Sequence, residues 1–156
     1  MKKWLMVVAA VAISVGAFAA EGWLTDFDKA KEMAKEKDRH ILIDFSGSDW
    51  CGWCIKLDKE VFQKEAFKDY ANENLVLMLA DFPRDKSGQS DDVQKQNKEL
   101  AEKFGVRGFP TVFLLAPSGE IVAKTGYREG GPEAYVEHIK QLANEAKTGG
   151  KATGDT

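Results

Sequence analysis

The residues of this chain best suited to chemistry are Cys51 and Cys54, its only cysteines, which stand three positions apart. At that spacing on a helix, two Cβ atoms lie about 5–6 Å apart, so a disulfide can form after a small adjustment. The pair opens a predicted helical segment directly after a short apolar run, which places Cys51 near a helix N-terminus. The unpaired N–H groups there favour a thiolate and lower a cysteine pKa from about 8.5 into the range of about 3.5–7.5. We therefore expect Cys51 to be the exposed nucleophile and Cys54 to be the thiol that resolves a mixed disulfide.

Three other uses of a cysteine pair have to be weighed. A zinc site needs about four ligands, and the chain adds only His40, His138 and carboxylates, with both histidines expected at the surface. Covalent haem attachment needs a histidine directly after the second cysteine, but Ile55 stands there. An inert structural disulfide would close a loop of only four residues and so remove little chain entropy. We predict redox chemistry without a bound metal, with zinc and a structural bridge as the alternatives.

Two tryptophans, Trp50 and Trp53, flank the first cysteine, and Gly52 stands between them. The indole rings are expected to form an apolar collar around the sulfur atoms. Gly52 is expected to let the chain bend closely at this point. These three residues are therefore predicted to contact a substrate beside the reactive sulfurs.

The segments around the pair alternate between apolar strands and amphipathic helices. Strands are predicted over 40–45, 75–79, 111–116 and 121–125. Helices are predicted over 26–37, with Thr25 as the N-cap, and over 54–70, 93–104 and 132–146. Strands separated by helices favour parallel neighbours, whereas the turn at Pro117–Gly119 favours an antiparallel final hairpin. The pattern predicts an α/β protein whose mixed sheet is covered by helices on both faces.

Length and composition limit the class of protein. The chain has 156 residues, of which 44% are hydrophobic and 30% charged, so one globular domain with a core is expected. Its net charge is −3 and it has no extended basic cluster, which makes nucleic acid an unsuitable partner. No long exposed apolar stripe demands a second copy, so we expect a monomer.

The first residues have the pattern of an export signal. Lys2 and Lys3 precede the apolar run Trp4–Val15, and Ala17-Phe18-Ala19 then fits the small-residue rule for signal cleavage. The predicted parts are a signal peptide over 1–19, with 20 as the alternative cleavage position, a folded domain over 21–146 and a disordered tail over 147–156. The apolar run is shorter than the roughly 20 residues of a membrane span, so the mature chain is expected in the periplasm or outside the cell and not inserted in a membrane. An uncleaved membrane anchor is the alternative.

Two stretches of the chain together resemble the thioredoxin superfamily: Trp50–Cys54 after the predicted strand, and Gly108–Thr111 before the third one. More closely, the sequence is similar to small secreted thioredoxin-like proteins and to the thioredoxin-like domain of transmembrane thiol:disulfide reductases. That similarity covers roughly Phe27–Leu142, and its motifs are Asp49–Phe62, Ala80-Asp81, Phe104–Val106 and Gly108–Phe113. The resemblance implies a thioredoxin-like sandwich, with a central mixed sheet of about four to five strands flanked by about four helices. One departure is the first strand, for which only the short stretch Gly22–Leu24 is available.

The resemblance also implies roles for three residues outside the cysteine pair. Pro110 would be a cis-proline facing the sulfurs, and the backbone of Phe109 would pair with an extended substrate segment. Asp44 would be a buried acid whose pKa is raised by burial and which relays a proton to the deeper thiol. However, Asp44 lies seven residues before Cys51, one more than in thioredoxin, so a catalytic and a purely structural role both stay open.

The function that follows is an exported thiol–disulfide oxidoreductase acting on protein or peptide thiols and disulfides. Its redox-active disulfide Cys51–Cys54 would be its only redox centre, with no other cofactor. The resemblance favours reduction, with a membrane reductase as the electron donor. A disulfide oxidase or isomerase is one alternative, and a non-catalytic module that binds peptides in a Phe109-Pro110 groove is the other.

Overall fold

The computed structural model describes residues 22–148, so the predicted signal peptide and residues 149–156 of the predicted tail lie outside the described residues. The elements are β1 (Trp23–Leu24), α1 (Phe27–Lys37), β2 (His40–Ser46), α2 (Gly52–Leu57), α3 (Glu65–Asn74), β3 (Leu75–Asp81), α4 (Asp91–Phe104), β4 (Thr111–Leu115), β5 (Ile121–Thr125) and α5 (Gly131–Lys147). A π-helical turn, η1 (Asp58–Phe62), follows α2, and a 3₁₀ turn, η2 (Lys86–Gly88), precedes α4.

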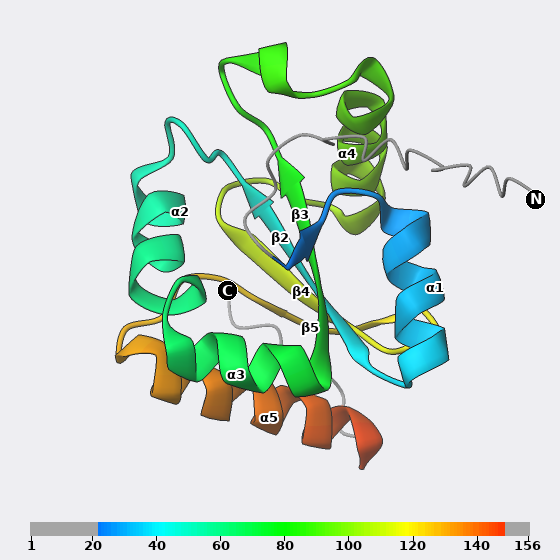
Figure 1. Cartoon of the computed structure of the whole chain (residues 1–156), viewed down its shortest axis with the longest axis vertical. Coiled ribbons are helices and arrows are strands. Elements are labelled where there is room, and N and C mark those ends of the chain that lie inside the picture. Colours follow the sequence, from blue (N-terminus) through cyan, green and yellow to red (C-terminus); the bar gives the residue numbers. More distant parts are fainter. Residues whose placement is uncertain (1–21, 149–156) are drawn as a thin grey trace, which may run out of the picture.

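The five strands form one mixed sheet in the order β1-β3-β2-β4-β5 (Figure 1). Strands β1 and β2 each pair in parallel with β3, while β4 pairs antiparallel with both β2 and β5. The predicted mixed sheet and its antiparallel closing hairpin are confirmed. The first strand is as short as expected, because β1 has two residues. Strand β2, which leads to the cysteines, lies in the middle of the sheet.

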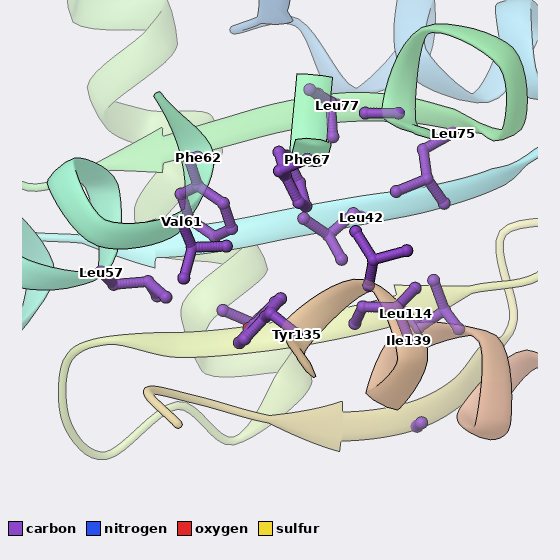
Figure 2. Close-up of a cluster of buried hydrophobic side chains, with 14 residues drawn as sticks. Leu42, Leu57, Val61, Phe62, Phe67, Leu75, Leu77, Leu114, Tyr135 and Ile139 are labelled. Atoms are coloured by element: carbon purple, nitrogen blue, oxygen red, sulfur yellow. The ribbon is translucent and has the colours of Figure 1, made fainter. Parts of the chain in front are cut away.

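Helices cover both faces of this sheet. Ile41 and Phe45 of β2 pack on one face with residues of α1 and α4. Leu42 lies in the cluster on the other face, with residues of α2, η1, α3 and α5. Figure 2 shows Leu42 in that second cluster together with Phe67 of α3 and Ile139 of α5. The predicted thioredoxin-like sandwich is therefore confirmed.

The single helix predicted over 54–70 is two helices joined by a wider turn. The N–H of Gln63 donates to the carbonyl of Asp58 at 2.9 Å, a bond across five residues that defines a π-helical turn. Lys64 is then extended, with φ −87° and ψ 143°, before α3 begins. Val61 and Phe62 are consecutive residues of this turn, and both are buried. In a regular helix, two consecutive side chains point in directions about 100° apart. The described residues consequently form five α-helices, where about four were expected.

The start of α1 also differs from the prediction. Its N-cap is Asp26, whose carboxylate accepts the N–H of Lys29 at 3.0 Å. The carbonyl of Thr25, the predicted N-cap, instead accepts a hydrogen bond from the Gln96 side chain at 2.9 Å. Because Gln96 also accepts the N–H of Phe27 at 2.8 Å, one side chain of α4 fixes the beginning of α1.

Candidate active site

The two cysteines stand where the sequence predicts, at the beginning of the helix that follows β2. Cys51 is the N-cap of α2, with an extended backbone (φ −87°, ψ 107°), and it forms a disulfide with Cys54. Their Cα atoms are 5.2 Å apart, and the Cys51 sulfur also accepts the N–H of Cys54 at 3.3 Å. A donor of this kind stabilises a negative charge on the sulfur, which favours Cys51 as the thiolate in the reduced protein.

Cys51 is much less exposed than the sequence suggests. Its exposed fraction is 7% in the disulfide-bonded protein, against 3% for Cys54. The expectation of an openly exposed Cys51 is therefore wrong for this redox state. The reason is that its side chain turns back to cap the helix and bond to the other sulfur, so little of it faces solvent.

Gly47, which the sequence analysis missed, organises the turn between β2 and the cysteines. Its N–H donates to the Cys54 sulfur at 3.5 Å, and its carbonyl accepts the N–H of Cys51 at 2.8 Å. A Cβ at this position would stand 2.5–2.7 Å from the indole ring of Trp50, closer than real side chains come. Only glycine therefore lets the indole lie against this turn while the backbone contacts both cysteines. The sole sequence signal was a glycine between two serines, a pattern that indicates a turn but no contact.

Trp50 belongs to an aromatic wall formed by Trp50, Phe82 and Phe109. The Trp50 ring is 40% exposed, and its Nε1–H donates to the carbonyl of Phe82 at 2.8 Å. The Trp50 and Phe109 rings meet edge to face with centroids 5.9 Å apart, and the Phe109 ring centroid in turn lies 5.1 Å from that of Phe82. The peptide bond from Phe109 to Pro110 is cis. The structure thus brings the segment before Cys51 and the segment at Pro110 together through their aromatic side chains.

Trp53 contacts a different group of side chains from those around Trp50. It is 56% exposed, and its ring centroid is 5.0 Å from that of Tyr127. The Lys56 ammonium stands 5.0 Å from each of these two rings, and Tyr127 donates to the Glu60 carboxylate at 2.7 Å. The predicted collar is therefore two separate aromatic groups.

Gly52 has no steric need to be glycine. It begins α2 outside the left-handed region, and no atom lies within 4 Å of the place where a Cβ would stand. The position where a close neighbour requires glycine is instead Gly47, and the bend at Gly52 stays a prediction. Any contact of Gly52 with a substrate stays a prediction.

Asp44 is buried on β2, with 5% of its surface exposed. Alternate residues of a strand face the same side, so Asp44 shares the side of Leu42, which α2 and η1 cover. Burial, and then the negative charges of Asp58 and Asp81, raise the pKa of its carboxyl to about 8. Its Oδ1 atom has no hydrogen-bond partner within residues 22–148. A carboxyl with this pKa can exchange a proton near neutral pH.

No metal centre is evident in the part of the chain that the structure describes. Among residues 22–148, no group of three or more histidine, cysteine or acidic side chains is placed to hold a metal ion. His138 instead pairs its Nε2 with the Thr125 hydroxyl at 2.9 Å. No helix in this part is long and apolar enough to cross a membrane.

Comparisons with known proteins agree with this geometry. Residues 27–143 match the family described as "Thioredoxin-like domain". The "Disulfide bond reductase DsbH" of Chlamydia pneumoniae is 35% identical over 114 residues, which cover 73% of this chain and 68% of that protein. The "Thioredoxin-related protein DsbJ" of the same organism is 29% identical over 104 residues, 67% of this chain but 30% of that longer protein. A solved structure, "DsbH Oxidoreductase", has a TM-score of 0.74 at 30% identity, covering 92% of this chain and 95% of its own.

Proposed function

This chain belongs to the thioredoxin-like family and is a thiol–disulfide oxidoreductase with the pair Cys51–Cys54, and on that premise we propose that it is an exported protein-disulfide reductase. The observation that carries the activity is the disulfide at the beginning of α2, beside the aromatic wall. Support for reduction comes from the printed name of the 35% identical relative, a disulfide bond reductase. Support for export comes from the signal-peptide pattern of residues 1–19.

The proposed reaction moves two electrons from the protein to a substrate disulfide. The Cys51 thiolate attacks one substrate sulfur, forms a mixed disulfide and releases the first substrate thiolate. The Cys54 thiolate then attacks the Cys51 sulfur, which restores the disulfide Cys51–Cys54 and releases the second substrate thiol. The Gly47 N–H donates to the Cys54 sulfur and so stabilises the Cys54 thiolate. A membrane reductase would return the pair to the dithiol form.

We assign the proton transfer at Cys54 to Asp44. A carboxyl with a pKa of about 8 is mostly protonated at pH 7 but still has an ionised fraction that can accept the thiol proton. Trp50, Trp53, Phe109 and Pro110 would form the surface that meets the substrate. We also propose that the mature protein is a monomer, which sedimentation velocity would check.

Insulin reduction with dithiothreitol as the electron source tests the activity. Wild-type protein should accelerate the reduction, and Cys51→Ala should abolish the acceleration. Cys54→Ala should accumulate mixed disulfides with its substrates, because the resolving thiol is missing. An inactive wild type, or turnover that Cys51→Ala leaves unchanged, would instead favour a module that binds peptides at Phe109-Pro110.

The equilibrium reduction potential against glutathione decides the direction of electron flow. A reductase is expected to have a potential near that of thioredoxin, about −270 mV, whereas a value near about −120 mV would identify an oxidase. An intermediate value near about −180 mV would favour an isomerase. N-terminal sequencing of the protein recovered from the periplasm or the medium tests export, and the expected first residue is Ala20 or Glu21.

A further inference from the structure

The turn before Cys51 is connected to the segment that follows β3. Both segments leave the sheet at the carboxyl ends of the neighbouring parallel strands β2 and β3 (Figure 1). The Phe82 N–H donates to the Ser46 carbonyl at 2.7 Å, and the Ser48 hydroxyl donates to the Asp81 carboxylate at 2.5 Å. These contacts join residues more than 30 positions apart, so the shape of the active-site turn depends on a distant segment.

Asp49 makes two further connections to this distant segment. Its Oδ1 accepts the N–H of Arg84 at 2.9 Å, and its Oδ2 accepts the N–H of Asp85 at 3.0 Å. The two backbone N–H groups, that of Asp85 first, lower the pKa of the Asp49 carboxyl below its usual range. Because both oxygens are engaged by consecutive amides, the carboxylate fixes the position and the orientation of this backbone.

The backbone segment bound by the Asp49 carboxylate also contacts the Trp50 side chain. The carbonyl of Phe82, two residues before Arg84, accepts the Trp50 indole N–H at 2.8 Å. The Arg84 guanidinium itself stands 5.7 Å from the centre of the indole ring. The Phe82 ring also packs on Phe109, which in turn contacts the Trp50 ring. Every contact of the indole described so far, apart from Gly47, therefore involves the segment fixed by Asp49 or a ring that packs on it.

We propose that Asp49 is a positioning residue for substrate binding, whose carboxylate holds the backbone of Arg84 and Asp85 and thereby keeps the Trp50 indole against Phe109 before a substrate arrives. A surface that is already ordered loses less conformational entropy on binding than one that must be ordered by the ligand. The effect is expected on substrate affinity rather than on thiol chemistry, since no hydrogen bond joins the Asp49 side chain to either cysteine in residues 22–148. This inference rests on the proposed function.

Steady-state reduction of a disulfide-bonded peptide by Asp49→Ala and Asp49→Asn tests the proposal. Asp49→Ala should raise KM roughly three- to tenfold, with kcat and the reduction potential close to wild type. Asp49→Asn, which keeps one oxygen acceptor, should raise KM less. Asp92→Ala removes an exposed charge at the start of α4 and should leave KM unchanged. Urea unfolding of each variant verifies that it is folded.

A second measurement separates positioning from general damage to the fold. Trp50→Phe keeps an aromatic ring but lacks the N–H that donates to Phe82, so it disconnects the ring from the segment that Asp49 holds. In that background, Asp49→Ala should raise KM by less than half of its effect in wild type. The Trp50 indole N–H signal in an ¹⁵N NMR spectrum should also shift in Asp49→Ala.

The outcomes distinguish this inference from the function on which it rests. A wild type without turnover contradicts the proposed function. A wild type with turnover, combined with an unchanged KM in Asp49→Ala, overturns the positioning role alone. Fully additive KM effects overturn it as well. So does a changed reduction potential at constant KM, because that result would assign Asp49 an electrostatic effect on the sulfurs.

Discussion

Two aspartates five positions apart lie in contrasting environments: Asp44 is on β2, and Asp49 is in the turn before Cys51. Asp44 is buried, and its Oδ1 finds no hydrogen bond in the described part of the chain. Asp49 is exposed, and both of its oxygens accept backbone N–H groups. Burial raises the pKa of Asp44 to about 8, while hydrogen bonds from Asp85 and Arg84 lower the pKa of Asp49.

The contrast shows that the same type of side chain can have two different roles within one strand and the turn that follows it. A carboxylate with satisfied oxygens stays ionised and fixes the backbone around it, which suits the outer surface of a binding site. A buried carboxyl with an unsatisfied oxygen is costly when ionised, so it holds its proton to a higher pH and becomes available for proton transfer. The carboxylate that fixes the backbone, Asp49, is therefore at the surface, and the carboxyl that is available for proton transfer, Asp44, is in the interior.

The largest expected effect comes from removing the charge that Asp44 can carry. The folded pKa of about 8 lies above the ordinary value of 3.8, so the folded protein keeps a proton that the unfolded chain releases. The stability that this proton contributes is complete below about pH 4 and is lost as the pH rises to about 8, by up to about 1.4 kcal/mol per pH unit. Asp44→Asn should lack this loss and should exceed wild type in stability at pH 8. Urea unfolding at pH 5, 6, 7 and 8 with the disulfide intact measures it, and parallel curves for both proteins would contradict the contrast.

The next effect concerns Gly47, which lies between the two aspartates. In Gly47→Ala, the new methyl group would overlap the Trp50 indole, at about 1–3 kcal/mol of destabilisation. Activity should fall too, because the ring and the Cys54 sulfur both depend on this residue. Gly88→Ala is the matched control, since nothing lies within 4 Å of its Cβ position, and its stability should change by about 0.5 kcal/mol or less. Urea unfolding and insulin reduction compare the two variants, and equal losses in both would show that the close contact is unimportant.

The smallest expected effect tests how much a neighbouring charge contributes to the raised pKa of Asp44. The negative charge of Asp58 raises the pKa of Asp44, although less than burial does. Asp58→Asn should therefore lower the Asp44 pKa by less than about one unit, and it keeps an oxygen that can accept from Gln63. A ¹³C NMR titration of the Asp44 carboxyl follows the shift, with Glu65→Gln on α3 as a control for a lost surface charge. An unchanged or higher Asp44 pKa in Asp58→Asn would contradict a contribution from the Asp58 charge and would leave burial and Asp81 as the causes of the raised pKa.

The sheet, its hairpin and the cysteine pair could be predicted because their signals are local. Apolar runs mark β2, β3 and β4 wherever they lie in the fold, and the spacing of Cys51 and Cys54 fits one face of a helix without further information. The family resemblance added the position of Asp44, whose catalytic role stays a prediction.

The missed features depend on residues that are distant in the sequence. Gly47 must be glycine because of the direction of the Trp50 ring, and that direction is set by the carbonyl of Phe82. The Asp49 carboxylate accepts its hydrogen bonds from backbone N–H groups, and a pattern of side chains in the sequence does not predict such contacts. Likewise, the low exposure of Cys51 follows from its side-chain direction, which spacing does not determine.

The pairing of strand β2 has one further consequence for the mixed disulfide proposed at Cys51. All seven of its residues pair with β3, and five of them pair also with β4. Because β2 is hydrogen-bonded on both sides, the strand that leads to Cys51 is anchored in the sheet by two neighbours rather than held at an edge. A substrate joined to Cys51 would therefore be attached next to a central strand of the sheet.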